Sequence, residues 1–168
     1  MIKNTFLLLL PLLLLSCEGP TGPQGPAGQN GNANVKAYVF NNLNWSEIGG
    51  EAFVSGQLSA INAGVLSTGA VLTYASIFDN NGSEVQWQLP WTVVEGTYQE
   101  NVFMMYSTGT WYLTNTASDD LPTLYEDIPK IKIVVIQGTS GKKEMVNPNI
   151  SWEELVARYP NMETIEMN

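Results

Sequence analysis

Beyond residue 34 the chain is a succession of short β-branched and aromatic runs, each ended by Asn, Gly or Asp, and this pattern constrains its fold most strongly. Such runs are typical of antiparallel strands, because branched and aromatic side chains suit a pleated, half-buried surface and the interrupting residues favour tight turns. About seven short strands are predicted, over residues 35–40, 52–59, 70–78, 84–91, 101–106, 111–116 and 130–137. They predict a mainly β fold, an antiparallel β-sandwich or an open barrel.

Two turns and one apolar run predict how some of these strands are arranged. Asn81-Gly82 lies between the third and fourth predicted strands, which should form a hairpin because Asn-Gly is favoured where the backbone needs positive φ. Residues 107–110, Ser-Thr-Gly-Thr, predict a second hairpin turn. Strand 130–137 is apolar on both faces toward its end, which predicts a central place in its sheet.

Near the C-terminus the periodicity changes to that of a helix. Ser151 and Glu154 have the spacing of a capping box, in which each side chain bonds the other residue's backbone amide. An apolar stripe at i, i+3, i+4 and i+7 follows, made of Trp152, Leu155, Val156 and Tyr159. We expect one short helix that docks onto the sheet by this stripe and ends at Pro160. A helix left free for a partner is the alternative.

Residues 1–16 predict a cleaved signal peptide. They carry one basic residue, Lys3, and an apolar run over residues 6–15, which is too short for a transmembrane helix of roughly 20 residues. The run ends in Leu14-Leu15-Ser16-Cys17, which resembles the lipobox of bacterial lipoproteins. That resemblance implies cleavage before Cys17 and acylation of its sulfur and its new amino group.

Cys17 is the only cysteine of the chain, so no intramolecular disulfide can form and lipidation is the favoured role for its thiol. A soluble secreted protein with an incidental cysteine is the alternative. Several acyl chains would anchor the protein stably, whereas a single chain anchors only marginally.

A collagen-like repeat follows the cysteine. Glycine recurs at every third residue, at positions 19, 22, 25, 28 and 31, with proline second in the first three triplets. So short a repeat is expected to be a semi-extended spacer, on the order of 50 Å long over residues 18–34, rather than a stable triple helix. We therefore expect a monomer, with a collagen-type trimer as the alternative. The domains would be residues 1–16, the signal peptide; 17–34, the acylated cysteine and spacer; and 35–168, the β domain with its helix.

Charge and composition exclude several classes of function. The chain has seven Lys and Arg, sixteen Asp and Glu, and no histidine, for a net charge of −9. Without histidine there can be no Ser-His-Asp triad, Cys-His pair or His-ligated metal, and the negative charge argues against nucleic acid as a partner. We expect neither enzymatic activity nor a cofactor, with a small carboxylate-dependent hydrolase as the remaining catalytic alternative. An acidic domain is repelled by anionic lipid, so the membrane should be contacted only through the N-terminal lipid.

Aromatic and amide side chains offer a candidate glycan site. Tyr112 lies between threonines on its strand face and is the best candidate for an exposed ring, while Gln86 and Gln88 could supply hydrogen bonds from an outer strand face. Trp87 and Trp91 alternate with polar residues and are expected to face the core.

Two oxygen-rich stretches are weak calcium candidates. Asp79, Asn81 and Glu84 form the first, which a hairpin turn explains equally well. The second consists of Asp119, Asp120, Glu126 and Asp127. The favoured interpretation of this second stretch is a solvated acidic loop without metal.

The lipobox, the Gly-Pro-x triplets and four later segments together resemble the uncharacterised collagen-like lipoproteins of Bacteroidetes. The later segments are 69–74, 86–91, 130–138 and 152–159. The resemblance implies a cell-envelope lipoprotein, in the outer membrane, with surface or periplasmic orientation left open. The function expected is a lipid-anchored binding or structural module whose ligand the sequence does not identify, with a protein or a glycan both left open. A glycan-binding accessory protein that uses exposed aromatics is the alternative.

Overall fold

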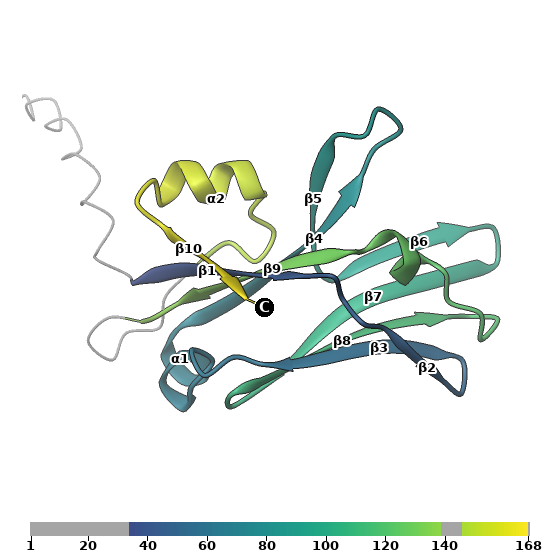
Figure 1. The fold of residues 1–168 in the computed structure, drawn as a ribbon, viewed down its shortest axis with the longest axis horizontal. Coiled ribbons are helices and arrows are strands. Elements are labelled where there is room, and N and C mark those ends of the chain that lie inside the picture. The colour runs from purple at the N-terminus through teal and green to yellow at the C-terminus, as the bar shows by residue number, and fades with distance from the viewer. Residues whose placement is uncertain (1–33, 139–145, 168) are drawn as a thin grey trace, which may run out of the picture.

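Two five-stranded sheets pack face to face in the computed structural model, which describes residues 34–138 and 146–167 (Figure 1). Sheet A contains, in spatial order, β10 (Glu163–Met167), β1 (Val35–Asn41), β9 (Lys130–Ile136), β4 (Ala70–Phe78) and β5 (Glu84–Gln88). Sheet B contains β2 (Ser46–Ile48), β3 (Glu51–Gln57), β8 (Thr110–Ala117), β7 (Tyr98–Ser107) and β6 (Trp91–Glu95). All neighbours are antiparallel except β1 and β10, which are parallel. The predicted mainly β fold is confirmed, and its architecture is the sandwich.

The two predicted hairpins are confirmed. β4 pairs with β5 and β7 pairs with β8, and the turn glycines Gly82 and Gly109 have φ of 78° and 77°. The predicted central place of β9 is confirmed too, since β9 lies between β1 and β4. The turn residues therefore predicted the two hairpin pairings correctly, and the apolar residues on both faces of β9 predicted its central place correctly.

The predicted strand 84–91 is wrong as a single element. β5 ends at Gln88 in sheet A and β6 begins at Trp91 in sheet B, so the chain crosses between the sheets at Leu89 and Pro90. Proline has no N–H to donate to a ladder, which suits it to this crossing. The short strands β2, β6 and β10, the helix α1 (Ala63–Thr68) and the 3₁₀ turn η1 (Leu124–Asp127) were not predicted.

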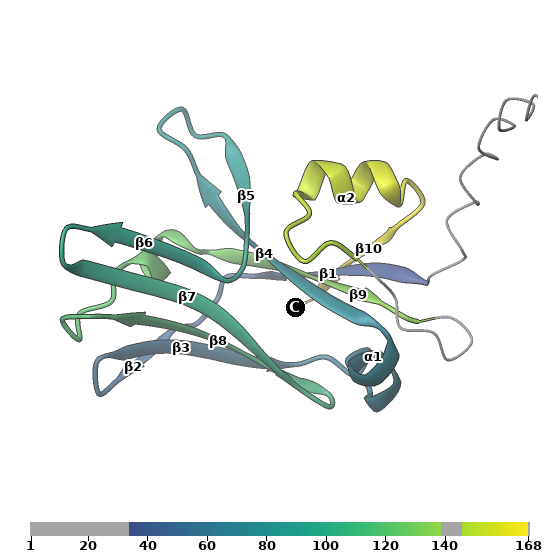
Figure 2. The ribbon, with the colours of Figure 1, turned by 180° about the vertical axis from the view of Figure 1, so that it is seen from behind.

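Sheet A buries apolar side chains on both faces. Its inner face packs against sheet B through residues such as Ile131, Ile133 and Val135. Its outer face packs under α2 (Trp152–Arg158), which Figures 1 and 2 show on the side of sheet A away from sheet B. This second core explains why β9 is apolar on both faces.

The predicted docking of the C-terminal helix is confirmed. Leu155 is fully buried, Tyr159 is buried, and the capping box between Ser151 and Glu154 is formed. Val156 is the member of the predicted stripe that the sheet does not cover, with 41% of its surface exposed.

Candidate functional site

Part of β3 has a free edge, although β3 is not the last strand of its sheet. β8 pairs with all seven residues of β3, whereas β2 pairs only with Glu51, Ala52 and Phe53. Residues 54–57 therefore have a partner strand on one side only.

The alternation of backbone groups shows which of these residues face the free side. The N–H of Leu58 donates to the carbonyl of Gly109 on the β8 side, at 2.9 Å. Because backbone groups point to alternate sides along an antiparallel strand, Val54 and Gly56 also face β8. The N–H and C=O groups of Ser55 and Gln57 therefore face the edge that no strand of the described residues covers.

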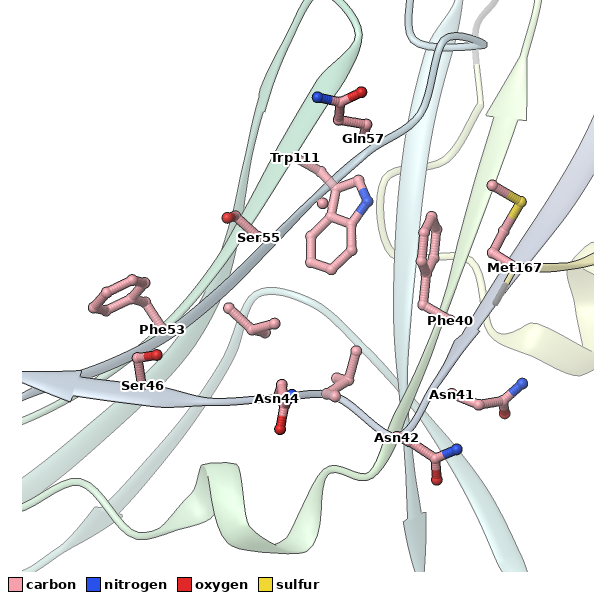
Figure 3. Close-up of a pocket in the computed structure, with 13 residues that line it drawn as sticks. Phe40, Asn41, Asn42, Asn44, Ser46, Phe53, Ser55, Gln57, Trp111 and Met167 are labelled. Atoms are coloured by element: carbon pink, nitrogen blue, oxygen red, sulfur yellow. The ribbon is translucent and has the colours of Figure 1, made fainter.

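A cavity of about 490 Å³ lies between this edge and the ends of β1 and β10, and we term it the edge cleft (Figure 3). Its apolar lining consists of Phe40, Leu43, Phe53, Val54, Gly56, Trp111 and Met167. Its polar lining consists of Asn41, Asn42, Asn44, Ser46, Ser55 and Gln57. The volume falls within the range of about 300–1,000 Å³ common for ligand sites. No lining residue is charged, although the chain is strongly acidic.

Trp111 forms the inner wall of the edge cleft. It lies on β8 directly opposite Gly56 of β3 and is 2% exposed. A Cβ at Gly56 would lie 2.5 Å from the indole ring, so only glycine lets the ring rest on the β3 backbone. Gly56 was not among the predicted site residues, although a glycine inside a strand often marks such a close approach.

The indole nitrogen of Trp111 has no conventional hydrogen-bond partner. Nε1 is the one buried side-chain nitrogen or oxygen atom of the described residues without one. The rings of Trp111 and Phe40 meet edge to face, with centroids 4.8 Å apart. Figure 3 shows the nitrogen on the side of the indole that is turned toward Phe40, whose ring face is only a weak acceptor. A donor is thus held at the inner wall of the cleft.

Tyr112 lies on the outer face of sheet B and is 44% exposed, which agrees with the exposed ring predicted from the sequence. Its cross-strand neighbours are Ser55 and Met105. The next row across the same face is Phe53, Thr114 and Phe103. We term the surface made by Phe53, Phe103, Met105, Tyr112 and Thr114 the Tyr112 face.

Gln86 and Gln88 lie on the outer face of sheet A, so the structure does not bring them together with Tyr112. Gln86 accepts a hydrogen bond from Ser76 at 2.9 Å and donates to Glu84 at 2.6 Å. Gln88 donates to the carbonyl of Pro148. Both amides are therefore engaged in holding sheet A and the segment before α2.

The expectation that Trp87 packs in the core is wrong. Trp87 is 43% exposed and stacks on the half-buried Trp91, with ring centroids 5.1 Å apart. Figures 1 and 2 show the tip of the β4–β5 hairpin projecting away from sheet B. Sheet B therefore covers only part of the inner face of that hairpin, and Trp87 stays partly exposed.

The residues of the first calcium candidate form a turn and an ion pair. Asp79 accepts hydrogen bonds from the backbone amides of Asn81 and Ser83, at 2.9 and 2.8 Å. Glu84 binds Lys130 at 2.6 Å and Lys132 at 3.4 Å. Hydrogen bonding to Lys130, with smaller contributions from Ser76, Lys132 and Gln86, lowers the pKa of Glu84 to about 2 despite partial burial. Its charge is already balanced by the two lysines.

The second calcium candidate is spread over two turns. Asp119 accepts a hydrogen bond from the backbone amide of Leu121, and Asp120 packs against Gly50. Glu126 and Asp127 are exposed at η1. Within residues 34–138 and 146–167, no three His, Cys, Asp or Glu side chains gather closely enough to hold a metal ion.

Glu100 is a buried carboxylate that sequence analysis did not single out. It is 2% exposed and accepts hydrogen bonds from the amides of Thr123 and Leu124, at 2.6 and 2.7 Å, and from the Tyr98 hydroxyl. Burial by itself would raise the pKa of Glu100, but these donors, together with Asn115, outweigh burial and lower the pKa below its ordinary value. Glu100 therefore holds the loop after β8 onto β7.

Cys17, the signal peptide and the collagen-like spacer lie outside the described residues. Within the described part of the chain, no helix is long and apolar enough to cross a membrane. Comparisons of the chain with protein-family models, with curated proteins and with solved structures found no match.

Proposed function

We propose that this chain is a lipid-anchored lipoprotein of the cell envelope, in the outer membrane, whose β-sandwich is a binding module. The observation that carries the binding role is the edge cleft, where an unpaired strand edge borders an uncharged cavity. The lining contains no acid, base or thiol, which favours binding over proton transfer or nucleophilic chemistry.

The anchoring part of the proposal rests on Leu14-Leu15-Ser16-Cys17 and on the spacer that follows. β1 begins at Val35, directly after the spacer, and its other end at Phe40 and Asn41 borders the edge cleft. At about 3.3 Å per residue, these ends lie roughly 20 Å apart along the strand. The arrangement would point the cleft away from the anchor.

Detergent phase partitioning of the protein made in a bacterial host tests the anchor. We expect the wild-type chain to incorporate labelled palmitate and to enter the detergent phase. The Cys17→Ala variant should do neither, because it lacks the sulfur that is acylated. Equal partitioning of both forms would contradict the proposal. Protease shaving of intact cells then distinguishes a surface from a periplasmic orientation.

A glycan-binding accessory protein is the second candidate. It is favoured by the exposed ring of Tyr112 on the Tyr112 face, which contains no charged residue. Sugar rings stack on such surfaces through their C–H faces. For any polysaccharide the protein retains in affinity electrophoresis, Tyr112→Ala should abolish the retardation. Val94→Ala, at a more exposed apolar residue of sheet B, should not change it. Unchanged retardation in Tyr112→Ala would remove this candidate.

A further inference from the structure

We propose that the edge cleft binds an extended, uncharged peptide, which adds as a strand to the free edge of β3 and places one apolar side chain against Trp111. The inference rests on the proposed binding function and names the class of partner for the same site.

The backbone of β3 provides the hydrogen-bonding half of this site. Ser55 and Gln57 each present one N–H and one C=O to the free side, the spacing at which an added strand pairs. Natural sheets usually protect such edges with proline, lysine or a bulge. Residues 54–57 are Val-Ser-Gly-Gln, with neither proline nor charge, and they pair regularly with β8. This edge is therefore open to a strand.

The cavity provides the side-chain half. Side chains of an extended peptide alternate between two faces, so every second one would enter the space between the sheets. Trp111, Phe40 and Met167 line that space and offer an apolar surface. The buried Trp111 N–H, which has no conventional partner, lies at its inner wall beside Phe40.

Charge determines which peptide fits. The cleft lining is uncharged, so neither an acidic nor a basic peptide would find a counter-ion there. The nearby carboxylate of Glu166 is bound by the Asn41 amide at 2.7 Å. An uncharged peptide is the occupant that matches this lining.

The orientation of the polar side chains favours a peptide over a sugar. Figure 3 shows Asn42, Asn44 and Ser55 turned away from the Trp111 ring. A sugar in the cavity would therefore meet apolar walls and one strand edge, with few partners for its hydroxyls. An extended peptide pairs its backbone groups with the strand edge and packs its apolar side chain on the apolar wall, so it needs no further polar partner.

The test uses ¹⁵N-labelled full chain carrying Cys17→Ala and the probe acetyl-Thr-Val-Thr-Leu-Thr-Val-Thr-amide. We expect the probe to shift the Trp111 indole resonance and to slow hydrogen exchange at Ser55 and Gln57 at least about tenfold. The same peptide N-methylated at alternate amides, in the register that blocks pairing, should lose both effects. Because this chain is not lipidated, the result is independent of the anchoring part of the proposed function.

A matched pair of variants tests the edge itself. Ser55→Pro removes the N–H that faces the added peptide but leaves every N–H of the β3–β8 ladder in place. The affinity for the probe should therefore fall about tenfold or more. Val94→Ala, at an exposed residue of β6 outside the edge cleft, should bind like wild type. Thermal unfolding shows whether both variants are folded. If Ser55→Pro is not folded, the edge is tested by comparing the probe with its N-methylated form on a chain that keeps Ser55.

Three results would overturn the inference. In the first, exchange at Ser55 and Gln57 stays unchanged at millimolar probe. In the second, these amides become protected with rising protein concentration alone, which would make a second copy the occupant. In the third, cellohexaose shifts the Trp111 indole resonance while the peptide does not, which would make the cleft a glycan site.

Discussion

Gly56 and Trp111 show how one missing side chain shapes the edge cleft. The indole rests on the β3 backbone only because residue 56 has no Cβ. Glycine within the predicted strand 52–59 was a visible signal of close approach, but the sequence did not reveal what approached it. The partner ring is far along the chain, on a different strand, and only the β3–β8 register brings the two together.

Glu100 should be the most costly acid to neutralise. The Glu100→Gln variant keeps the size of the side chain but turns an amide group toward backbone N–H donors that now bind a carboxylate. We expect a loss of about 1.5–3 kcal/mol in the free energy of unfolding, measured with urea at pH 7. Glu95→Gln, at an exposed position of β6, should change it by less than about 0.5 kcal/mol. Similar values for the two variants would contradict the assigned role of Glu100.

Glu84 should make stability depend on pH in the acid range. Its pKa is about 2 in the folded chain and lies below its ordinary value of 4.5, so its stabilising effect is present above pH 4.5 and is lost as the pH falls toward 2. Because the side chain is 31% exposed, we expect only about 1 kcal/mol. Urea unfolding should show Glu84→Gln less stable than wild type at pH 7 and nearly equal near pH 2. An equal difference at both pH values would refute this assignment.

At the scale of elements, the sequence predicts what neighbouring residues determine and misses what distant ones determine. The Asn81-Gly82 turn and the Ser151 capping box are local, and both are confirmed. The alternation of Val85, Trp87, Leu89 and Trp91 runs on without a break, although the chain changes sheet within it. Periodicity specifies the face of a strand, and it does not specify the sheet to which the strand belongs.

The helix α2 offers a direct test of the second core. Leu155 is fully buried against sheet A, whereas Val156, the next residue, is 41% exposed. Leu155→Ala should lower the free energy of unfolding by about 2–5 kcal/mol, because it removes buried methyl groups and leaves a cavity. Val156→Ala should cost under about 1 kcal/mol by the same measurement. If both variants lost the same stability, the helix would not be docked as described.

At the scale of the whole molecule, the edge cleft joins parts of the chain that are far apart in sequence. Phe40 comes from the first strand, Trp111 from the middle of the chain and Met167 from the last strand. β10 reaches the site only because it pairs in parallel with β1, a pairing without a local sequence signal. The sequence could therefore predict the sandwich and the exposure of Tyr112, and it could not predict this cavity.

We propose that Cys17 anchors this sandwich by lipid, and the mass of the N-terminal peptide, from protein extracted from the membranes of producing bacteria, tests this directly. We expect a peptide that begins at Cys17 and carries a diacylglyceryl group and an amide-linked acyl chain, with residues 1–16 removed. A peptide that retains residues 1–16, or one in which Cys17 carries a free thiol, would contradict it.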